Sequence, residues 1–152
     1  DWLVIGVGSE ENAADQIKHY QKFTVNIPDE SFMLEMEQAG LSSHREKIAK
    51  LGLDFQPSEL TQAPIFDACP VVLDCKGDRI IEEDGICHIF AKILDRLAES
   101  DLLDDRGHFN NDCFAPTYFM GDGNKRVYRY LDDRVDSMGR FIKKARKKND
   151  KS

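Results

Sequence analysis

Apolar and polar residues alternate along this chain in short blocks. The first block, Trp2–Gly8, has no polar or charged side chain, which is typical of a strand with both faces buried. A polar turn at residues 9–12 follows, then a helical segment at 13–20 and a second strand at 23–28. A strand buried on both faces needs neighbours on both sides, and the chain does not start with Met. We therefore expect an N-terminal segment to precede these residues.

Two further strands are expected in the middle of the chain. The β-branched run Val71–Cys75 begins directly after Pro70, and residues 76–79 read as a turn, although Ile80 and Ile81 can extend the pairing. In Ile86–Leu94, alternation places His88 on the same face as an aromatic and a lysine, opposite a purely apolar face. We expect the two runs to pair as antiparallel strands.

Three other segments show helical spacing: residues 32–39, the segment after Ser43, and residues 138–148. In the second of them, Ser43 and Glu46 can form a capping box. Short strands are expected at 114–120 and 127–131. Strands and helices in this order predict a mainly β domain of the α+β class, and 152 residues are enough for one such domain.

Composition and charge indicate a globular protein and argue against one class of partner. The chain is 41% apolar and 32% charged, as globular proteins are. Its net charge of −7 argues against general nucleic-acid binding. Residues 1–139 hold 14 basic and 27 acidic side chains, whereas residues 140–152 hold seven basic and one acidic. We expect a domain at 1–134 and a basic helix or tail at 135–152. The tail is either a solvated end or a contact for an anionic partner, such as the acidic body of a second subunit.

The cysteines and the lack of long apolar runs indicate in which cellular compartment the protein is expected. Cys69, Cys75, Cys87 and Cys113 form no CxxC pair and show no metal-ligand spacing, so we expect reduced core thiols and no metal site. No apolar run approaches the roughly 20 residues that span a bilayer, and none resembles a signal peptide. These features predict a cytoplasmic protein without a membrane segment.

Two polar segments are candidates for binding an anion. In the turn Ser9–Asn12, Asn12 is a good N-cap, and the first-turn amides of the helix behind it can hold an anion. An ordinary capped helix explains the same residues. A second segment brings hydroxyls, an imidazole and a cation together in Ser42, Ser43, His44 and Lys47. A solvated helix start explains that segment equally well.

His88 is the best single candidate for contact with a planar ring, because it lies beside an aromatic residue, although a lone strand histidine is often structural. The chain has no Ser-His-Asp order, no P-loop and no GxGxxG motif. Residue chemistry alone therefore predicts an α+β domain with hairpins, leaves an anion site as a candidate, and does not name the ligand.

The order and spacing of these segments resemble the flavin reductase-like family of FMN-binding split barrels, and the flavoredoxin group in particular. The matching segments are Trp2–Gly8, Ile17–Pro28, Ala39–Lys47, Ala63–Ile65, Cys69–Cys75, His88–Phe90 and Pro116–Tyr118. The resemblance implies an antiparallel split β-barrel of Greek-key type with peripheral helices, in which FMN lies near a homodimer interface.

The resemblance also implies roles by position. Ser9 and Asn12 would approach the FMN phosphate, and His88 would lie near the isoalloxazine or the nicotinamide and orient or polarise it. The phosphate or ribityl side would be approached by Ser42, Ser43, His44 and Lys47. The family often carries a cation in the phosphate turn, where this chain has Glu10 and Glu11.

By this resemblance the protein is an FMN-binding oxidoreductase. Hydride would pass from NAD(P)H to the flavin and on to a small-molecule or protein acceptor. Two alternatives stay open. One is a flavin-binding electron carrier without nicotinamide turnover. The other is a degenerate split barrel that holds no flavin and works through dimer contacts, which is motivated by the carboxylates Glu10 and Glu11.

Overall fold

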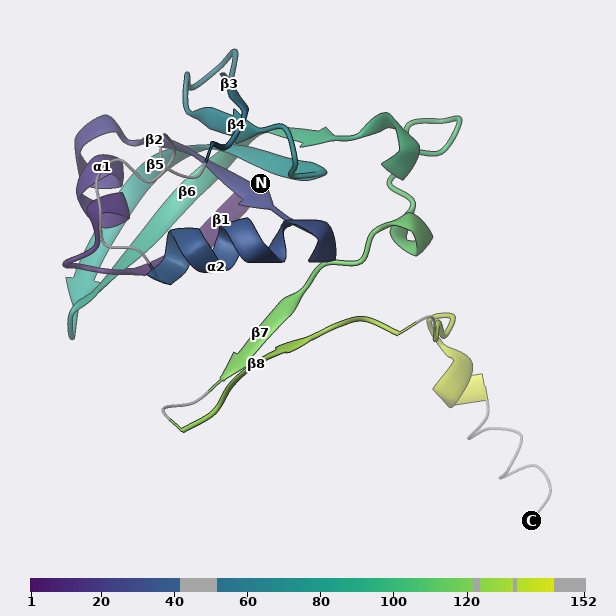
Figure 1. Ribbon diagram of the computed structural model, residues 1–152. Coiled ribbons are helices and arrows are strands. Elements are labelled where there is room, and N and C mark those ends of the chain that lie inside the picture. The colour runs from purple at the N-terminus through teal and green to yellow at the C-terminus, as the bar shows by residue number, and fades with distance from the viewer. Residues whose placement is uncertain (42–51, 122–123, 133, 144–152) are drawn as a thin grey trace.

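A computed structural model of the chain describes residues 1–41, 52–121, 124–132 and 134–143. Figure 1 shows a curled sheet with short helices, small hairpins and an extended C-terminal part. The elements, in order, are β1 (Trp2–Gly8), α1 (Asn12–Tyr20), β2 (Lys22–Ile27), the 3-10 helix η1 (Glu30–Phe32), α2 (Met33–Leu41), β3 (Phe55–Pro57), β4 (Pro64–Phe66), β5 (Val71–Glu83), β6 (Ile86–Ala98), η2 (Ser100–Leu102), η3 (Asn111–Cys113), β7 (Tyr118–Gly121) and β8 (Arg126–Arg129).

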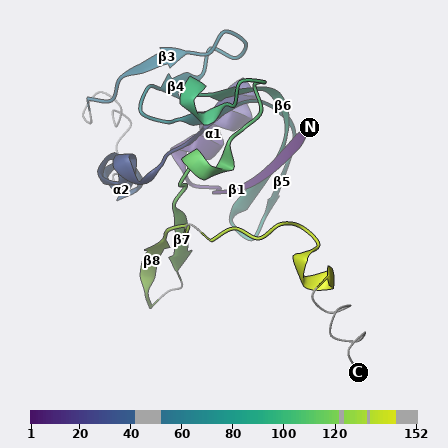
Figure 2. The same cartoon turned by 90° about the vertical axis from the view of Figure 1, so that its right-hand side faces the viewer.

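The main sheet has the strand order β1-β6-β5-β2, and each neighbouring pair is antiparallel. β5 and β6 form one long hairpin that closes at Asp84 and Gly85, both at positive φ, as a type I′ turn requires. The sheet curls around α1 as half of a barrel (Figures 1 and 2). The predicted antiparallel pairing of the two middle strands is confirmed, as is the α+β class.

The small β3–β4 hairpin lies along the outer edge of β2. The Asn26 side chain links them, because its Nδ2 donates to the Pro64 carbonyl at 3.2 Å and its Oδ1 accepts from the Phe66 amide at 2.9 Å. These two side-chain hydrogen bonds join the hairpin to the edge of β2 in place of backbone hydrogen bonds. The hairpin therefore continues the curvature of the sheet beyond β2.

The prediction of a turn at residues 76–79 is wrong, since β5 runs through this segment. The register shifts between Gly77 and Arg79, so the strand absorbs the polar residues as a β-bulge. The Gly77 amide donates at 2.8 Å to the carbonyl of Gln21, the left-handed residue that caps the C-terminus of α1. The turn-like composition therefore serves to bend the strand and to anchor the end of the helix.

The prediction that β1 is buried on both faces is also wrong for the described chain. Leu3, Ile5 and Val7 pack against the core around α1. Trp2 and Val4 point to the opposite, outer face and remain 56% and 55% exposed. The reason is that the core lies on the α1 side of the sheet, and no described element covers the other side.

The core is small and apolar, and it lies between α1 and the inner face of the sheet. Its buried members are Ala14, Ile17, Phe23, Cys75, Cys87, Ile89 and Ala91. The cysteines follow the prediction, because three of the four free thiols are buried and Cys113 is exposed. Burial raises the pKa of the Cys69 and Cys75 thiols to about 11, so both are neutral at physiological pH.

The C-terminal part is more extended than the sheet. Its two predicted strands are present over shorter ranges, as β7 and β8, which pair with each other. Of the helix predicted at residues 138–148, residues 140–143 are helical, residues 138–139 form a turn, and residues 144–148 lie outside the described residues. The division into a domain and a basic tail stays a prediction. No helix in the described residues is long and apolar enough to cross a membrane.

Candidate functional site

The turn between β1 and α1 is tied to the turn between β5 and β6. The Ser9 amide donates to the Gly85 carbonyl at 2.9 Å, and the Glu11 amide donates back to the Gly8 carbonyl at 3.0 Å. The N-cap of α1 is Glu11, which makes no side-chain cap bond, and Asn12 is the first helical residue. The prediction of Asn12 as N-cap is therefore wrong by one position, because the tight turn places the helix start one residue earlier.

His88 lies near the same end of the sheet, on its outer face. It pairs with Gly6 of β1 on one side and with Ile81 of β5 on the other. Its side chain is exposed and shares this face with Phe90, as the alternation predicted. Since Gly6 has no side chain, no side chain stands beside the His88 imidazole on the β1 side, and the surface there is shallow and apolar.

The structure thus places three of the predicted site residues, Ser9, Asn12 and His88, at one end of the sheet. Ser9 and Asn12 belong to the turn that leads to α1 on the inner face, whereas His88 lies on the outer face. The other four predicted residues lie outside the described residues: Ser42, Ser43, His44 and Lys47.

This end of the sheet is acidic. The joined turns bring Glu10 and Glu11 together with Glu83 and Asp84 at the adjacent hairpin end. Lys18 of α1 lies next to this group, where its Nζ binds Glu82 Oε2 at 2.7 Å. That hydrogen bond raises the pKa of Lys18 and lowers the pKa of Glu82, so both are charged and paired at neutral pH.

The described residues match parts of a flavin. The Ser9 hydroxyl and the N-terminal amides of α1 suit the oxygen atoms of a ribityl phosphate. The apolar surface beside His88, with Phe90 and Ile81, suits a planar ring. Each group is chemically suited to one part of a flavin, although α1 starts on the inner face and His88 lies on the outer face. A cation for the phosphate has to come from elsewhere, and Lys47 is the predicted source.

A buried polar cluster was not singled out from the sequence. Asp74 of β5 is 2% exposed, and its two carboxylate oxygens accept hydrogen bonds from the Ser58 and Thr61 hydroxyls. Ser58 Oγ in turn accepts from the Leu60 and Thr61 amides, each at 3.1 Å. The cluster ties the β3–β4 loop to the sheet and is closed to solvent, so it is structural. The feature of the sequence that could have revealed this cluster is Asp74, a single carboxylate within an otherwise apolar strand, because a buried polar group needs hydrogen-bond partners.

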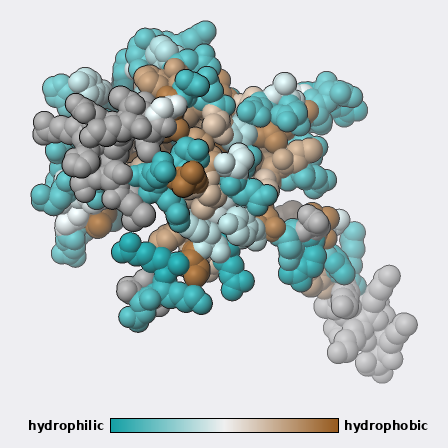
Figure 3. Space-filling view, in the orientation of Figure 1, coloured by the Kyte–Doolittle hydropathy of each residue, from teal (hydrophilic) through white to brown (hydrophobic). Residues whose placement is uncertain are grey.

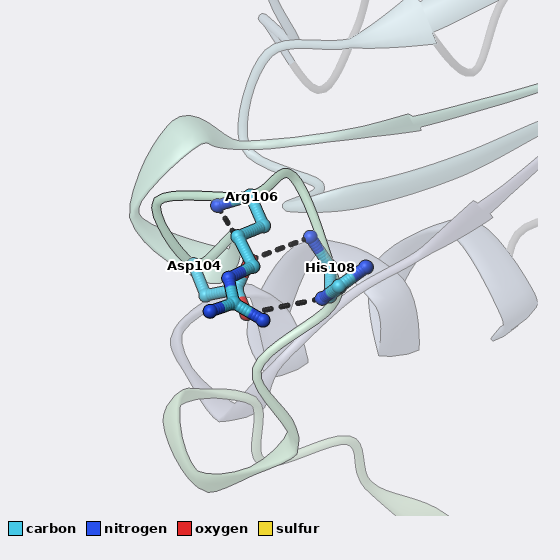
Figure 4. Close-up of polar contacts among 3 residues, drawn as sticks. All are labelled: Asp104, Arg106 and His108. Atoms are coloured by element: carbon cyan, nitrogen blue, oxygen red, sulfur yellow. Dashed lines mark hydrogen bonds and ion pairs between the residues drawn. The ribbon is translucent and has the colours of Figure 1, made fainter.

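A second polar cluster lies at the far end of β6, in the loop that follows it (Figure 4). Asp104 Oδ1 accepts from the amides of Arg106 and His108, and Oδ2 lies 3.3 Å from His108 Nδ1. These backbone hydrogen bonds lower the pKa of Asp104. The cluster therefore shapes an exposed loop. Within the described ranges no three metal-ligating side chains lie close enough together to hold an ion.

Comparison with solved structures identifies the fold of the chain. No protein-family model and no curated protein matches the chain. The 2-nitrobenzoate 2-nitroreductase of Pseudomonas fluorescens matches with a TM-score of 0.79 and 25% identity, over 90% of this chain and 68% of that one. The flavoredoxin of Desulfovibrio vulgaris (Miyazaki F) matches with a TM-score of 0.80 and 22% identity, over 90% and 73%.

An FMN-binding protein of Thermus thermophilus also matches, with a TM-score of 0.73 and 12% identity, over 90% of this chain and 72% of that one. These three proteins share the curled antiparallel sheet with this chain, although their sequences differ widely from it. The chain therefore has the flavin reductase-like fold of the FMN-binding split barrels.

Proposed function

We propose that this protein binds FMN and acts as a flavin reductase-like oxidoreductase. The observation that carries the proposal is the match of nine-tenths of the chain to a flavoredoxin, at a TM-score of 0.80. The placement of Ser9, Asn12 and His88 at one end of the sheet supports it. In this proposal NAD(P)H donates hydride, and a small molecule or a protein accepts the electrons.

The residues divide the work by their chemistry. Ser9 and the amides around Asn12 would hold the phosphate end, and Ser42, Ser43, His44 and Lys47 would add hydroxyls and positive charge. His88 would orient the ring or the nicotinamide. The flavin itself supplies the hydride-accepting chemistry, so the chain's own residues bind, position and exclude water.

We further propose that the protein is a cytoplasmic homodimer. The three buried, reduced cysteines support the compartment, because free thiols persist in reducing surroundings. The exposed apolar residues on β1 support an association between copies.

A second candidate, a split barrel without flavin, is favoured by one observation. Four carboxylates, Glu10, Glu11, Glu83 and Asp84, surround the turn where a phosphate would bind. Negative charge there opposes a phosphate dianion. A third candidate, an electron carrier without nicotinamide turnover, has the same binding site and differs in reactivity.

The visible spectrum of the purified protein, mixed with FMN and separated from free ligand, tests these candidates. We expect a bound flavin band that NADH or NADPH bleaches under anaerobic conditions. A bound band that neither nucleotide bleaches contradicts the reductase and supports the carrier. A colourless protein after incubation with excess FMN contradicts flavin binding altogether.

Replacing His88 by Ala is expected to slow flavin reduction about tenfold or more and to change the FMN dissociation constant less than about twofold, because His88 would orient the reacting ring and not hold the phosphate. Stopped-flow absorbance and fluorescence titration measure the two quantities. His108→Ala is the matched control, since His108 is also exposed but lies in the loop beyond the far end of β6. Equal reduction rates in both variants would remove His88 from the reaction.

A further inference from the structure

Three exposed lysines cross the outer face of the main sheet in one row. Lys22 of β2 lies directly opposite Lys76 of β5, and Lys76 lies directly opposite Lys92 of β6. Residues directly opposite each other in a sheet point to the same face. The neighbours Cys75 and Ala91 belong to the core, so the lysines point to the other, outer side. We call these three residues the lysine row.

The fold itself does not account for the lysine row. Like charges directly opposite each other destabilise a sheet. Lysine can protect an edge strand from aggregation, which explains Lys22 on β2, but Lys76 and Lys92 lie on the central strands β5 and β6. Among the described residues no carboxylate pairs with Lys22 or Lys76, and Lys92 Nζ lies 3.9 Å from Asp78 Oδ1. Hydrophilic residues cover much of the surface in Figure 3, yet the chain has a net charge of −7, so adjacent cations are unexpected in it.

Aromatic rings lie beside the lysine row. Trp2 of β1 is directly opposite Lys92, whose Nζ lies 5.4 Å from the centroid of the Trp2 ring. Phe90 lies two residues before Lys92 on the same face, and the Arg79 guanidinium carbon is 4.3 Å from its centroid. Nucleobases stack on aromatic rings and on guanidinium planes, and ammonium groups bind phosphate oxygens. The outer face therefore offers both kinds of contact side by side.

The lysine row is separate from the candidate phosphate site at the start of α1. Lys92 lies six residues along β6 from Ile86, which pairs with Gly8, the residue before Ser9. At roughly 3.4 Å per residue the two places are about 20 Å apart along the strand. A phosphate held at the turn of Ser9 therefore does not reach the lysine row, and the row is available to another anion.

We propose that the outer face binds a nucleotide with two or more phosphate groups, with the phosphates on the lysine row and the base against Trp2 and Phe90. Two strand spacings separate Lys22 from Lys92, about 10 Å, so a single phosphate contacts only part of the row. Adenosine diphosphate has this chemistry, either as a free nucleotide or as part of a dinucleotide such as NADPH. The proposal is independent of flavin binding.

Trp2 is the only tryptophan in the chain, so its fluorescence reports on this face. We expect ADP to quench it saturably in the flavin-free, full-length protein. AMP and inorganic pyrophosphate should each bind about tenfold more weakly, measured by isothermal titration calorimetry, because the first lacks a phosphate and the second lacks the base. Adenosine alone should show no saturable binding.

Variants of the lysine row separate a binding role from a structural one. Lys76→Gln should raise the ADP dissociation constant about tenfold, and Lys76→Gln with Lys92→Gln about 100-fold. Arg126→Gln with Arg129→Gln, on β8, is the matched control and should change it less than about twofold. The thermal midpoint of Lys76→Gln should stay the same or rise, because the variant removes repulsion between opposite lysines.

The dinucleotide identifies the source of the ligand. NADPH that binds more tightly than ADP, and weakens in the same lysine variants, makes the dinucleotide the ligand of this face. NADPH that binds no more tightly makes it a free nucleotide. The proposal is overturned if millimolar ADP gives no saturable signal, if the β8 control loses as much affinity as the lysine variants, or if pyrophosphate binds as tightly as ADP.

Discussion

Replacing Asp74 by Ala is expected to lower the free energy of unfolding by about 3 kcal/mol. The carboxylate is buried and accepts hydrogen bonds from the Ser58 and Thr61 hydroxyls. Without it, both hydroxyls lose their acceptor in a site that water does not reach, and a cavity remains. The β3–β4 loop would lose its anchor to β5 at the same time. Chemical denaturation with two spectroscopic probes measures the change.

Asp74→Asn is the matched control for this prediction. The amide has the shape of the carboxylate, its oxygen still accepts one hydroxyl, and its nitrogen can donate to the other. We expect Asn to cost about 1 kcal/mol or less. If Ala is tolerated as well as Asn, the cluster contributes little to stability, and the loop is held mainly by the bridge from Asn26 to β4.

Local patterns in the sequence predicted the strands and the helices well. The run at residues 2–8, the helix behind it and the strand that starts after Pro70 are present, because each depends on periodicity or on a local signal. Alternation also placed His88 on the correct face of β6. Such features are settled by neighbours within a few positions in the chain.

What the sequence did not predict depends on contacts between distant segments. Gly77 belongs to a bulge rather than a turn because it meets Gln21, more than fifty positions earlier. Asp74 is buried because its partners arrive from the β3–β4 loop. The outer face of β1 is exposed because the core lies on the other side of the sheet and no described element packs on the outer side. The sequence showed only two of the four carboxylates near Ser9, namely Glu10 and Glu11. Glu83 and Asp84 lie near them because the Ser9–Gly85 hydrogen bond joins the two turns.

That acidic neighbourhood leads to the second large effect. Replacing both Glu10 and Glu11 by Gln is expected to tighten FMN binding about 100-fold, or about tenfold for each carboxylate. Both side chains extend from the turn that presents the amides at the start of α1, and each opposes a phosphate dianion by Coulomb repulsion at short range. Glutamine has the same shape and can donate a hydrogen bond to a phosphate oxygen. Fluorescence titration with FMN measures the gain.

Two controls isolate the phosphate. Riboflavin has the same ring and ribityl chain without the phosphate, so its affinity should change less than about twofold in the same variant. Asp101→Asn with Asp105→Asn removes the same net charge in the loop beyond the far end of β6, and should leave FMN affinity nearly unchanged at physiological salt, because charges beyond about 8 Å are screened. An equal gain for FMN and riboflavin would place the phosphate away from this turn. An FMN affinity that stays low in the Gln variant would mean that the turn beside β1 holds no phosphate, and would favour the split barrel without flavin.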